Sequence, residues 1–202
     1  MKDKAAIKIK IIETPLSEET ARELRVGQSV LINGTIFTAR DKVHGYLMSQ
    51  KPRPEEMPFN LDGAIIYHCG PVISEENGSF TVIAAGPTTS QRMQMYEPFV
   101  ISHYGVRGII GKGGMSMEVA EAMRESGCVY LHAIGGAGAL LAEKIKKVEG
   151  VWMLEEFGRA EAMWALRVEE FPAFVTIDST GASIHAEVER TSKQRLSGLI
   201  QR

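Results

Sequence analysis

Cysteine is scarce in this sequence, which has only Cys69 and Cys128 among its 202 residues. A cubane iron–sulfur cluster usually takes several thiolate ligands from one polypeptide, so two isolated cysteines argue against a cluster held by this chain alone. No spacing of cysteine and histidine is typical of a zinc site. We expect both cysteines to be buried as small apolar residues.

Excess charge of one sign and long apolar runs are also lacking. The formal net charge is -2, so no global basic field favours nucleic acid, and any anion site must come from a local cluster. No apolar run reaches the roughly 18 residues of a membrane span. The start, Met1-Lys2-Asp3-Lys4, has no signal-peptide core, so we expect a cytoplasmic protein.

Short apolar segments alternate with helical patterns in the middle of the chain. Strands are expected at 7–11, 30–32, 64–67, 81–84, 106–110, 129–131, 151–154 and 174–177. Helices are expected at 17–27, 41–50, 88–104, 115–126 and 136–147. The alternation predicts an α/β fold with a mostly parallel central sheet, and the strand-rich ends predict an additional strand layer. The pair Asn33-Gly34 predicts a turn after the strand at 30–32.

Residues 1–186 are expected to form a single domain, since one domain is the default for a chain of this length. Residues 187–202 are polar and charged. We expect them to form a C-terminal tail that is frayed or bound to a partner.

A first cation-bearing segment runs from Gly34 to Asp41. A strand is expected to end in it and a helix to begin, so Arg40 would project at a sheet edge where ligands commonly bind. The alternative is a surface arginine beside a capping Asp41.

A second such segment runs from Gly86 to Arg92, where three hydroxyl residues after a Gly-Pro turn open the helix expected from Thr88. The free N–H groups and positive dipole end of a helix bind carboxylates. Arg92 lies four positions after Thr88, so both would face one side of the first turn. A guanidinium holds a carboxylate through two parallel hydrogen bonds. An ordinary capped helix is the alternative.

A third segment is the glycine-rich turn around Lys112. A phosphate-binding loop needs a glycine five positions before its Gly-Lys pair and a hydroxyl residue after it. Here Val106 and Gly113 occupy those positions, so the nucleotide motif fails. A lysine charge aimed into a cleft is the other interpretation. The glycines at 135–138 are interpreted as close helix-to-strand packing.

The three cations Arg40, Arg92 and Lys112 are expected to converge, because the carboxyl ends of parallel strands meet at one edge of a sheet. Three cations suit a small dianion, either a di- or tricarboxylate or a phosphate ester. The five histidines are interpreted as structural, and His68 is the best exception because it ends a buried strand.

The same segments resemble a known family, the β subunit or C-terminal domain of class I fumarases and L-tartrate dehydratases. The resemblance runs from about Leu16 to about Ile184. It is carried, in order, by Gly34-Thr35-Ile36-Phe37-Thr38-Ala39-Arg40-Asp41, Tyr67-His68-Cys69-Gly70-Pro71, Gly86-Pro87-Thr88-Thr89-Ser90-Gln91-Arg92-Met93, Ile110-Gly111-Lys112-Gly113 and the stretch from Phe171 to Ser179.

The resemblance implies a swivelling β/β/α domain that takes part in reversible addition of water to a carbon–carbon double bond of a dicarboxylate. It implies a partner, an α subunit that binds an oxygen-sensitive 4Fe-4S cluster through three cysteines, with no cofactor bound by this chain. The free iron of that cluster would act as a Lewis acid. A hetero-oligomer, such as a dimer of αβ pairs, is expected.

The resemblance also assigns roles to residues. Thr88 matches the active-site threonine, which must act with an acidic group of the partner because a free hydroxyl is a poor base. Substrate-binding roles, which include stabilising a charged intermediate, fall on Arg40, Thr89, Arg92 and Lys112. Supporting roles fall on Asp41, expected to hold Arg40, and on Gly86 and Gly111. One departure is Gln94, where many members have Asp.

Fumarate is the first choice of substrate and L(+)-tartrate the second. The string Gly-Thr-Ile-Phe-Thr-Ala-Arg favours the fumarase type, whereas His68 before Cys69-Gly70-Pro71 favours the tartrate type. Two other classes stay open: a non-catalytic module that binds an anionic metabolite, and a structural subunit whose cations only pair with acids of another chain.

Overall fold

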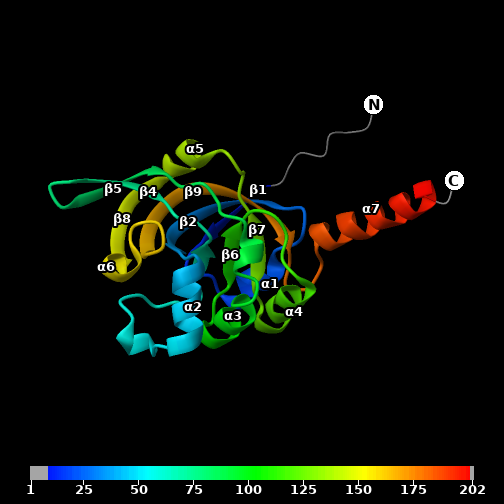
Figure 1. The fold of residues 1–202 in the computed structure, drawn as a ribbon, viewed down its shortest axis with the longest axis horizontal. Helices are drawn as coiled ribbons and strands as arrows, with labels where there is room; N and C mark the ends of the chain where they lie inside the picture. Colours follow the sequence, from blue (N-terminus) through cyan, green and yellow to red (C-terminus); the bar gives the residue numbers. More distant parts are fainter. Residues whose placement is uncertain (1–8, 201–202) are drawn as a thin grey trace.

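One mixed sheet of seven strands dominates the computed structural model, which describes residues 9–200 (Figure 1). The order across the sheet is β1-β2-β3-β6-β7-β9-β8. The strands are β1 (Ile9–Glu13), β2 (Ser29–Thr38), β3 (Ile65–Tyr67), β6 (Gly108–Gly111), β7 (Val129–His132), β8 (Ile145–Trp152) and β9 (Met163–Ile177). Neighbours from β1 to β7 are parallel, which βαβ crossovers require. The α/β class is confirmed, and the sheet is mixed because β9 is antiparallel to its neighbours.

The long strand β9 closes the sheet on itself. It pairs with β2 along most of its length, and its last residues pair with β7 on the other side. Phe174 has partners on both sides, opposite Ser29 of β2 and His132 of β7. The pairings therefore form a closed circuit β2-β3-β6-β7-β9, which leaves β1 and β8 as flanking strands.

The helices and a small hairpin cover this circuit. The elements are α1 (Glu18–Glu23), α2 (Asp41–Gln50), α3 (Glu97–Tyr104), α4 (Met117–Ser126), α5 (Gly138–Ala142), α6 (Leu154–Phe157), α7 (Ile184–Ile200), the 3-10 turns η1 (Pro54–Glu56) and η2 (Ser90–Arg92), and the hairpin β4 (Val72–Glu76) with β5 (Ser79–Ala84). Helices α2, α3 and α4 lie together on one side of the sheet, while the hairpin and α5 lie on the other (Figure 1). The hairpin is the second, smaller sheet.

Two apolar clusters fill the space on either side of the strands. One packs Val43 of α2, Val100 of α3 and Val119 of α4 against the sheet. The other gathers inward-facing residues of β2, β7 and β9 with Trp164, against which Phe80 of β5 packs edge to face. Each fully buried valine or larger apolar side chain contributes roughly 1.5–3 kcal/mol to folding through burial. Because the two clusters lie on opposite faces of the sheet, packing stabilises the strands from both sides.

Several predicted elements agree with the structure. The helix predicted at 41–50 has the bounds of α2, and Ser17 caps α1 by accepting a hydrogen bond from the Thr20 N–H at 3.1 Å. Ser116 likewise caps α4. The strands expected at 64–67 and 129–131 appear as β3 and β7.

The predicted turn at Asn33-Gly34 is wrong. Strand β2 continues through it to Thr38, with a register shift between Ile32 and Gly34 where it pairs with β9. Gly34 adopts a φ of +104°, and a Cβ there would lie 2.3 Å from Thr14 Oγ1. The dipeptide is therefore a β-bulge, because strand pairing on both sides outweighs its turn preference.

Two later predictions also differ from the structure. The helix expected at 136–147 is only α5, and residues from Ile145 onward form β8, since they pair with β9. The segment at 81–84 is strand as predicted, but it belongs to the hairpin with β4. Helix α7 begins at Ile184, so it crosses the boundary expected between residues 186 and 187. Among residues 9–200, no helix combines the length and hydrophobicity that crossing a bilayer demands.

Candidate active site

The segment from Gly86 to Arg92 runs across the carboxyl ends of β3 and β6. Pro87 bridges Cys69 in antiparallel fashion, and the Thr88 N–H donates to the His68 carbonyl at 2.7 Å. Thr89 then bridges Lys112 in parallel fashion. The segment thus extends the sheet edge locally and lies between the ends of two buried strands.

This geometry corrects the helix predicted from Thr88. Only the three-residue turn η2 is present near it, and the next helix, α3, begins at Glu97. The N–H groups of Thr88 and Ser90 already donate to the carbonyls of His68 and Lys112, at 2.7 and 3.0 Å. A helix N-terminus with free donors is therefore not available here, and anion binding at this segment would depend on side chains.

Arg40 precedes the first turn of α2, directly after β2. Its side chain is mostly buried, and Nη2 lies 3.1 Å from Glu161 Oε1. Its Nε is buried without a hydrogen-bond partner among residues 9–200. Gly70 leaves room for it, because a Cβ at that position would lie 2.6 Å from Arg40 Nη1.

The expected pairing of Asp41 with Arg40 is wrong. Asp41 Oδ2 instead lies 2.6 Å from Arg92 Nη2, while Glu161, which the sequence did not single out, pairs with Arg40. The reason is positional, because Asp41 begins α2 and faces the segment that passes in front of it. The ion pair joins the first and second cation-bearing segments.

Lys112 follows β6 and has a half-buried side chain. It makes no ion pair with any residue in the described part of the chain. Only glycine fits at the preceding position, because a Cβ at Gly111 would lie 1.9 Å from Ser90 Oγ and 3.0 Å from the Tyr130 hydroxyl. At Gly86, in contrast, a Cβ would make ordinary contacts with Gly138 at 3.6 Å.

The backbone of the three segments is therefore contiguous. Thr88 and Lys112 are linked through the extended segment, and Arg92 reaches the start of α2, where Arg40 lies. Of the hydroxyl residues, Thr89 is exposed and Thr88 is half-buried. The substrate-binding and catalytic roles of these residues stay predictions.

Four buried polar residues beneath these segments complete the local geometry: His44, His68, Ser90 and Glu97, none of which is exposed. Burial alone raises the pKa of Glu97, but the two imidazoles outweigh it by attraction and hydrogen bonding and lower that pKa to about 2. Only His68 carried a sequence signal, as the end of a buried strand. Glu97 resembles an ordinary first-turn acid of a helix, so the sequence did not mark it.

The two cysteines do not fit a metal cluster. Both are free and buried, and they belong to different apolar clusters. Burial raises the pKa of the Cys69 thiol to about 12, and it raises that of Cys128 as well. Such thiols are poor ligands, because a cluster binds the thiolate form.

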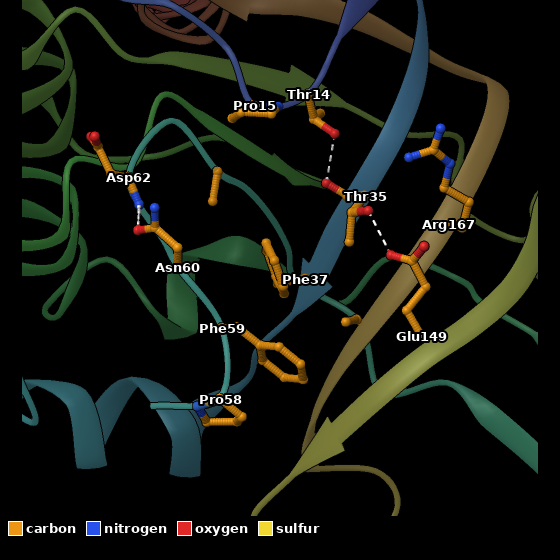
Figure 2. A pocket seen from close by; sticks show the side chains of 12 residues that line it. Thr14, Pro15, Thr35, Phe37, Pro58, Phe59, Asn60, Asp62, Glu149 and Arg167 are labelled. Carbon is orange, nitrogen blue, oxygen red and sulfur yellow. Dashed lines mark hydrogen bonds between the residues drawn. The ribbon is translucent and has the colours of Figure 1, made fainter. Parts of the chain in front are cut away.

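A cavity of about 540 Å³ lies between the end of β1, strand β2, the loop after η1 and strands β8 and β9, and Thr35 and Phe37 of the first cation-bearing segment line it (Figure 2). Phe37 and Phe59 form one wall, and Glu149 accepts a hydrogen bond from Thr35 at 2.6 Å on another. None of the predicted site residues lines this cavity.

Comparison with known proteins gives a match to one family, described as Fumarase C-terminus, over residues 1–188. The chain belongs to this fumarase C-terminus family. The match covers all of the cation-bearing segments and ends just inside α7.

Named relatives fall into two groups by length. A putative fumarate hydratase class I from Geobacillus stearothermophilus is 49% identical over 92% of this chain, which spans 35% of that protein. A putative L(+)-tartrate dehydratase subunit beta from Methanocaldococcus jannaschii is 41% identical, with 92% and 95% of the two chains covered. The L(+)-tartrate dehydratase subunit beta of Escherichia coli is 33% identical, with 95% and 94% covered. The chain therefore has the extent of a β subunit and about a third of the length of the first relative.

Proposed function

We propose that this chain is the β subunit of an iron–sulfur-dependent hydro-lyase that hydrates fumarate to L-malate reversibly and acts in the cytoplasm. The observation that carries the proposal is the contiguity of the three cation-bearing segments, joined by the Ser90–Lys112 hydrogen bond and the Asp41–Arg92 ion pair. Family membership, and relatives whose names denote a fumarate hydratase and tartrate dehydratase β subunits, support it.

In this proposal the three cations act on the two carboxylates of the substrate. Arg40 is held by Glu161 and Arg92 by Asp41, so an ion pair orients each of the two guanidiniums. Lys112 supplies a point charge from a short turn. Charge that develops on a carboxylate during proton abstraction would be stabilised by these cations, and such contacts typically change rates by 10²–10³-fold.

Thr88 is the proposed proton-transfer residue of this chain. Its backbone is fixed by the hydrogen bond to His68, so the side chain leaves the sheet edge in a defined direction. A threonine hydroxyl needs an acidic neighbour to take or give a proton at neutral pH, and we assign that group to the partner subunit. Thr89 is assigned to substrate contact.

The iron–sulfur cluster is assigned to an α subunit, because the two buried cysteines of this chain do not fit it. We further propose that the domain swivels relative to that subunit, and that αβ pairs assemble as a dimer. Residues 1–186 would be the swivelling domain and residues 187–202 an extension of it.

Reconstitution tests this function. Purified chain and α subunit are mixed anaerobically with iron and sulfide, and hydration of fumarate is followed. Activity in the mixture and in neither component alone supports the proposal. No activity on fumarate or L(+)-tartrate, with an intact cluster and an assembled complex, contradicts it.

L(+)-tartrate is the second candidate substrate, favoured by the two β-subunit relatives that this chain matches over 94–95% of their length. The ratio of kcat/KM for the two substrates in the same preparation decides between them. The competing binding-module function predicts tight binding of a sugar phosphate by the isolated chain, which calorimetry measures directly.

A further inference from the structure

A connected chain of buried polar side chains lies directly under the three cation-bearing segments. It comprises His44 of α2, His68 after β3, Ser90 of η2, Glu97 of α3 and Tyr130 of β7, all with no exposed surface. Burying polar groups destabilises a fold unless they are hydrogen-bonded, and apolar side chains would fill the same space at less cost. Five such residues from five elements therefore call for a reason other than core stability.

The hydrogen bonds among these buried side chains are donated in one direction, from Tyr130 through Ser90 and His68 to Glu97. Glu97 is ionised and can only accept, so His68 Nε2 must carry the proton that bridges the 2.5 Å to Glu97 Oε1. Burial lowers the pKa of His68, so its ring is neutral and Nδ1 is an acceptor. Ser90 Oγ, 2.8 Å away, then donates to Nδ1 and accepts a hydrogen bond from the Tyr130 hydroxyl, also at 2.8 Å.

His44 is in a different state. Its Nδ1 makes a 2.9 Å hydrogen bond to the Arg40 carbonyl, and its Nε2 lies 3.1 Å from Glu97 Oε1 in an ion-pair contact that lacks hydrogen-bond geometry. Both of these oxygens only accept, so an imidazolium with a proton on each ring nitrogen suits this position. Burial lowers the pKa of His44, but the attraction of Glu97 outweighs it and the net shift is upward. One buried imidazolium is thus paired with one buried carboxylate. Other titratable groups near this pair are Asp41, Cys128 and Tyr130.

The same residues hold the backbone of the functional segments. The backbone carbonyl of His68 accepts a hydrogen bond from the Thr88 N–H, and the backbone N–H of Ser90 donates to the Lys112 carbonyl. Nδ1 of His44, on α2, donates a hydrogen bond to the backbone carbonyl of Arg40. Each of the three segments is therefore tied to the buried chain by a hydrogen bond at a proposed functional residue.

Two other interpretations of the cluster fail on geometry. The order Ser90, His68, Glu97 is that of a hydrolytic triad, but the serine has no exposed surface and no substrate can reach its hydroxyl. A metal between His44, His68 and Glu97 would hold ligand atoms at about 2.0–2.2 Å from itself and so about 3 Å or more from one another. The 2.5 Å between His68 Nε2 and Glu97 Oε1 is a hydrogen bond instead.

We propose that Glu97, His44, His68 and Ser90 are positioning residues, which fix the Arg40, Thr88 and Lys112 segments relative to one another so that they grip a small dicarboxylate. This inference rests on the proposed function for its substrate. The buried ion pair has a second consequence, because it keeps α2 and α3 in register while leaving no net charge behind the cations.

The ionisation pattern is tested on the isolated chain, without any activity. Nitrogen-15 NMR of labelled histidines at neutral pH is expected to show His44 as an imidazolium and His68 as neutral, protonated on Nε2. In Glu97→Gln, His44 is expected to become neutral. A neutral His44 in the unaltered chain, or a charged His44 in Glu97→Gln, would overturn the ion-pair assignment.

The positioning role is tested with Ser90→Ala, which removes one link and no charge. Backbone amide shifts of Thr88 and Lys112 are expected to move in the isolated chain. In the reconstituted complex kcat/KM is expected to fall about 10–100-fold, the scale of a misplaced catalytic group. Thr176→Val is the matched control, because its hydroxyl is buried without a partner among residues 9–200, and it is expected to leave both readouts unchanged.

A double-mutant cycle separates positioning from mere stability. If Ser90 acts through Thr88, then Ser90→Ala costs much less activity in a Thr88→Ala background than alone. Additive losses, or unmoved amides at Thr88 and Lys112, would overturn the positioning role. An inactive unaltered complex would count against the proposed function, while the amide shifts and imidazole spectra would still decide the network.

Discussion

Arg92 Nη2 lies 2.6 Å from Asp41 Oδ2, and this ion pair joins two segments that are far apart in the sequence. The Arg92 side chain is 53% exposed, so the pair contributes roughly 0–1 kcal/mol to stability. Its effect is geometric, because it turns an exposed guanidinium toward the start of α2, where Arg40 lies. A cation that is steered but not buried suits a ligand that enters from solvent.

Arg92→Ala is expected to lower kcat/KM of the reconstituted enzyme by roughly 10²–10³-fold, because under the proposed function it removes a charge that stabilises the transition state. Steady-state kinetics measures this, and gel filtration checks that the complex still assembles. Arg124→Ala is a matched control, since Arg124 is 51% exposed and also paired with an acid, Glu121. Loss of assembly in Arg92→Ala alone would favour the structural-subunit interpretation.

Asp41→Asn is expected to act in the same direction with a smaller effect, about 3–10-fold in kcat/KM, because it leaves the cation and releases only its orientation. The loss should appear mostly in KM. Unchanged kinetics would show that the Arg92 guanidinium finds its place without this carboxylate.

Thr88→Ala is expected to lower kcat by roughly 10²–10⁴-fold, the usual range for a proton-transfer group. The fold should persist, because the hydrogen bond from residue 88 to the His68 carbonyl uses the backbone N–H. Thr88→Ser keeps a hydroxyl and should retain most of the activity. Turnover equal to that of the unaltered enzyme in Thr88→Ala would refute the role.

Stability is expected to depend on pH through Glu97. Its pKa is lowered from 4.5 to about 2 in the folded chain, so the unfolded chain binds the proton more readily. The stabilisation is therefore present above about pH 4.5 and is lost as the pH falls toward about 2, amounting to roughly 3 kcal/mol. Urea unfolding across that window measures it. Glu97→Gln should lose this part of the acid sensitivity, and an identical pH dependence in both proteins would contradict the assignment.

Gly111→Ala is expected to destabilise the chain by about 1–3 kcal/mol or more, because its Cβ would lie 1.9 Å from Ser90 Oγ. Gly135→Ala is the control, since its Cβ would meet Lys112 Cδ at an ordinary 3.6 Å. Thermal unfolding of both variants checks the difference. Equal melting temperatures would mean that the polar chain beneath Gly111 rearranges without strain.

Local sequence patterns predicted the elements that depend only on residues close in the sequence. Helix α2 and the Ser17 cap follow from helical periodicity and capping chemistry, which depend on neighbours in sequence. The bulge at Gly34 and the strand β8 do not, because each is imposed by pairing with the distant strand β9. The helix predicted from Thr88 is missing for a similar reason, because the Thr88 N–H donates to the carbonyl of His68, a residue distant in the sequence.

The positions of Arg40 and Lys112 were predictable, because each comes just after a strand, β2 or β6, whose apolar residues mark it in the sequence, while the roles of the cations stay predictions. Their partners were not, since Glu161 and Asp41 are chosen by tertiary distance rather than by spacing. The buried Glu97 was hidden for a related reason, because an acid in the first turn of a helix is commonplace on a surface.

The most direct measurement is a crystal structure of the assembled enzyme with fumarate or malate bound. The account predicts that Arg40, Arg92 and Lys112 all donate to the two carboxylates, with the Thr88 hydroxyl beside the carbon that loses or gains the proton. A dicarboxylate bound in the complex without contact to any of these three cations would contradict it.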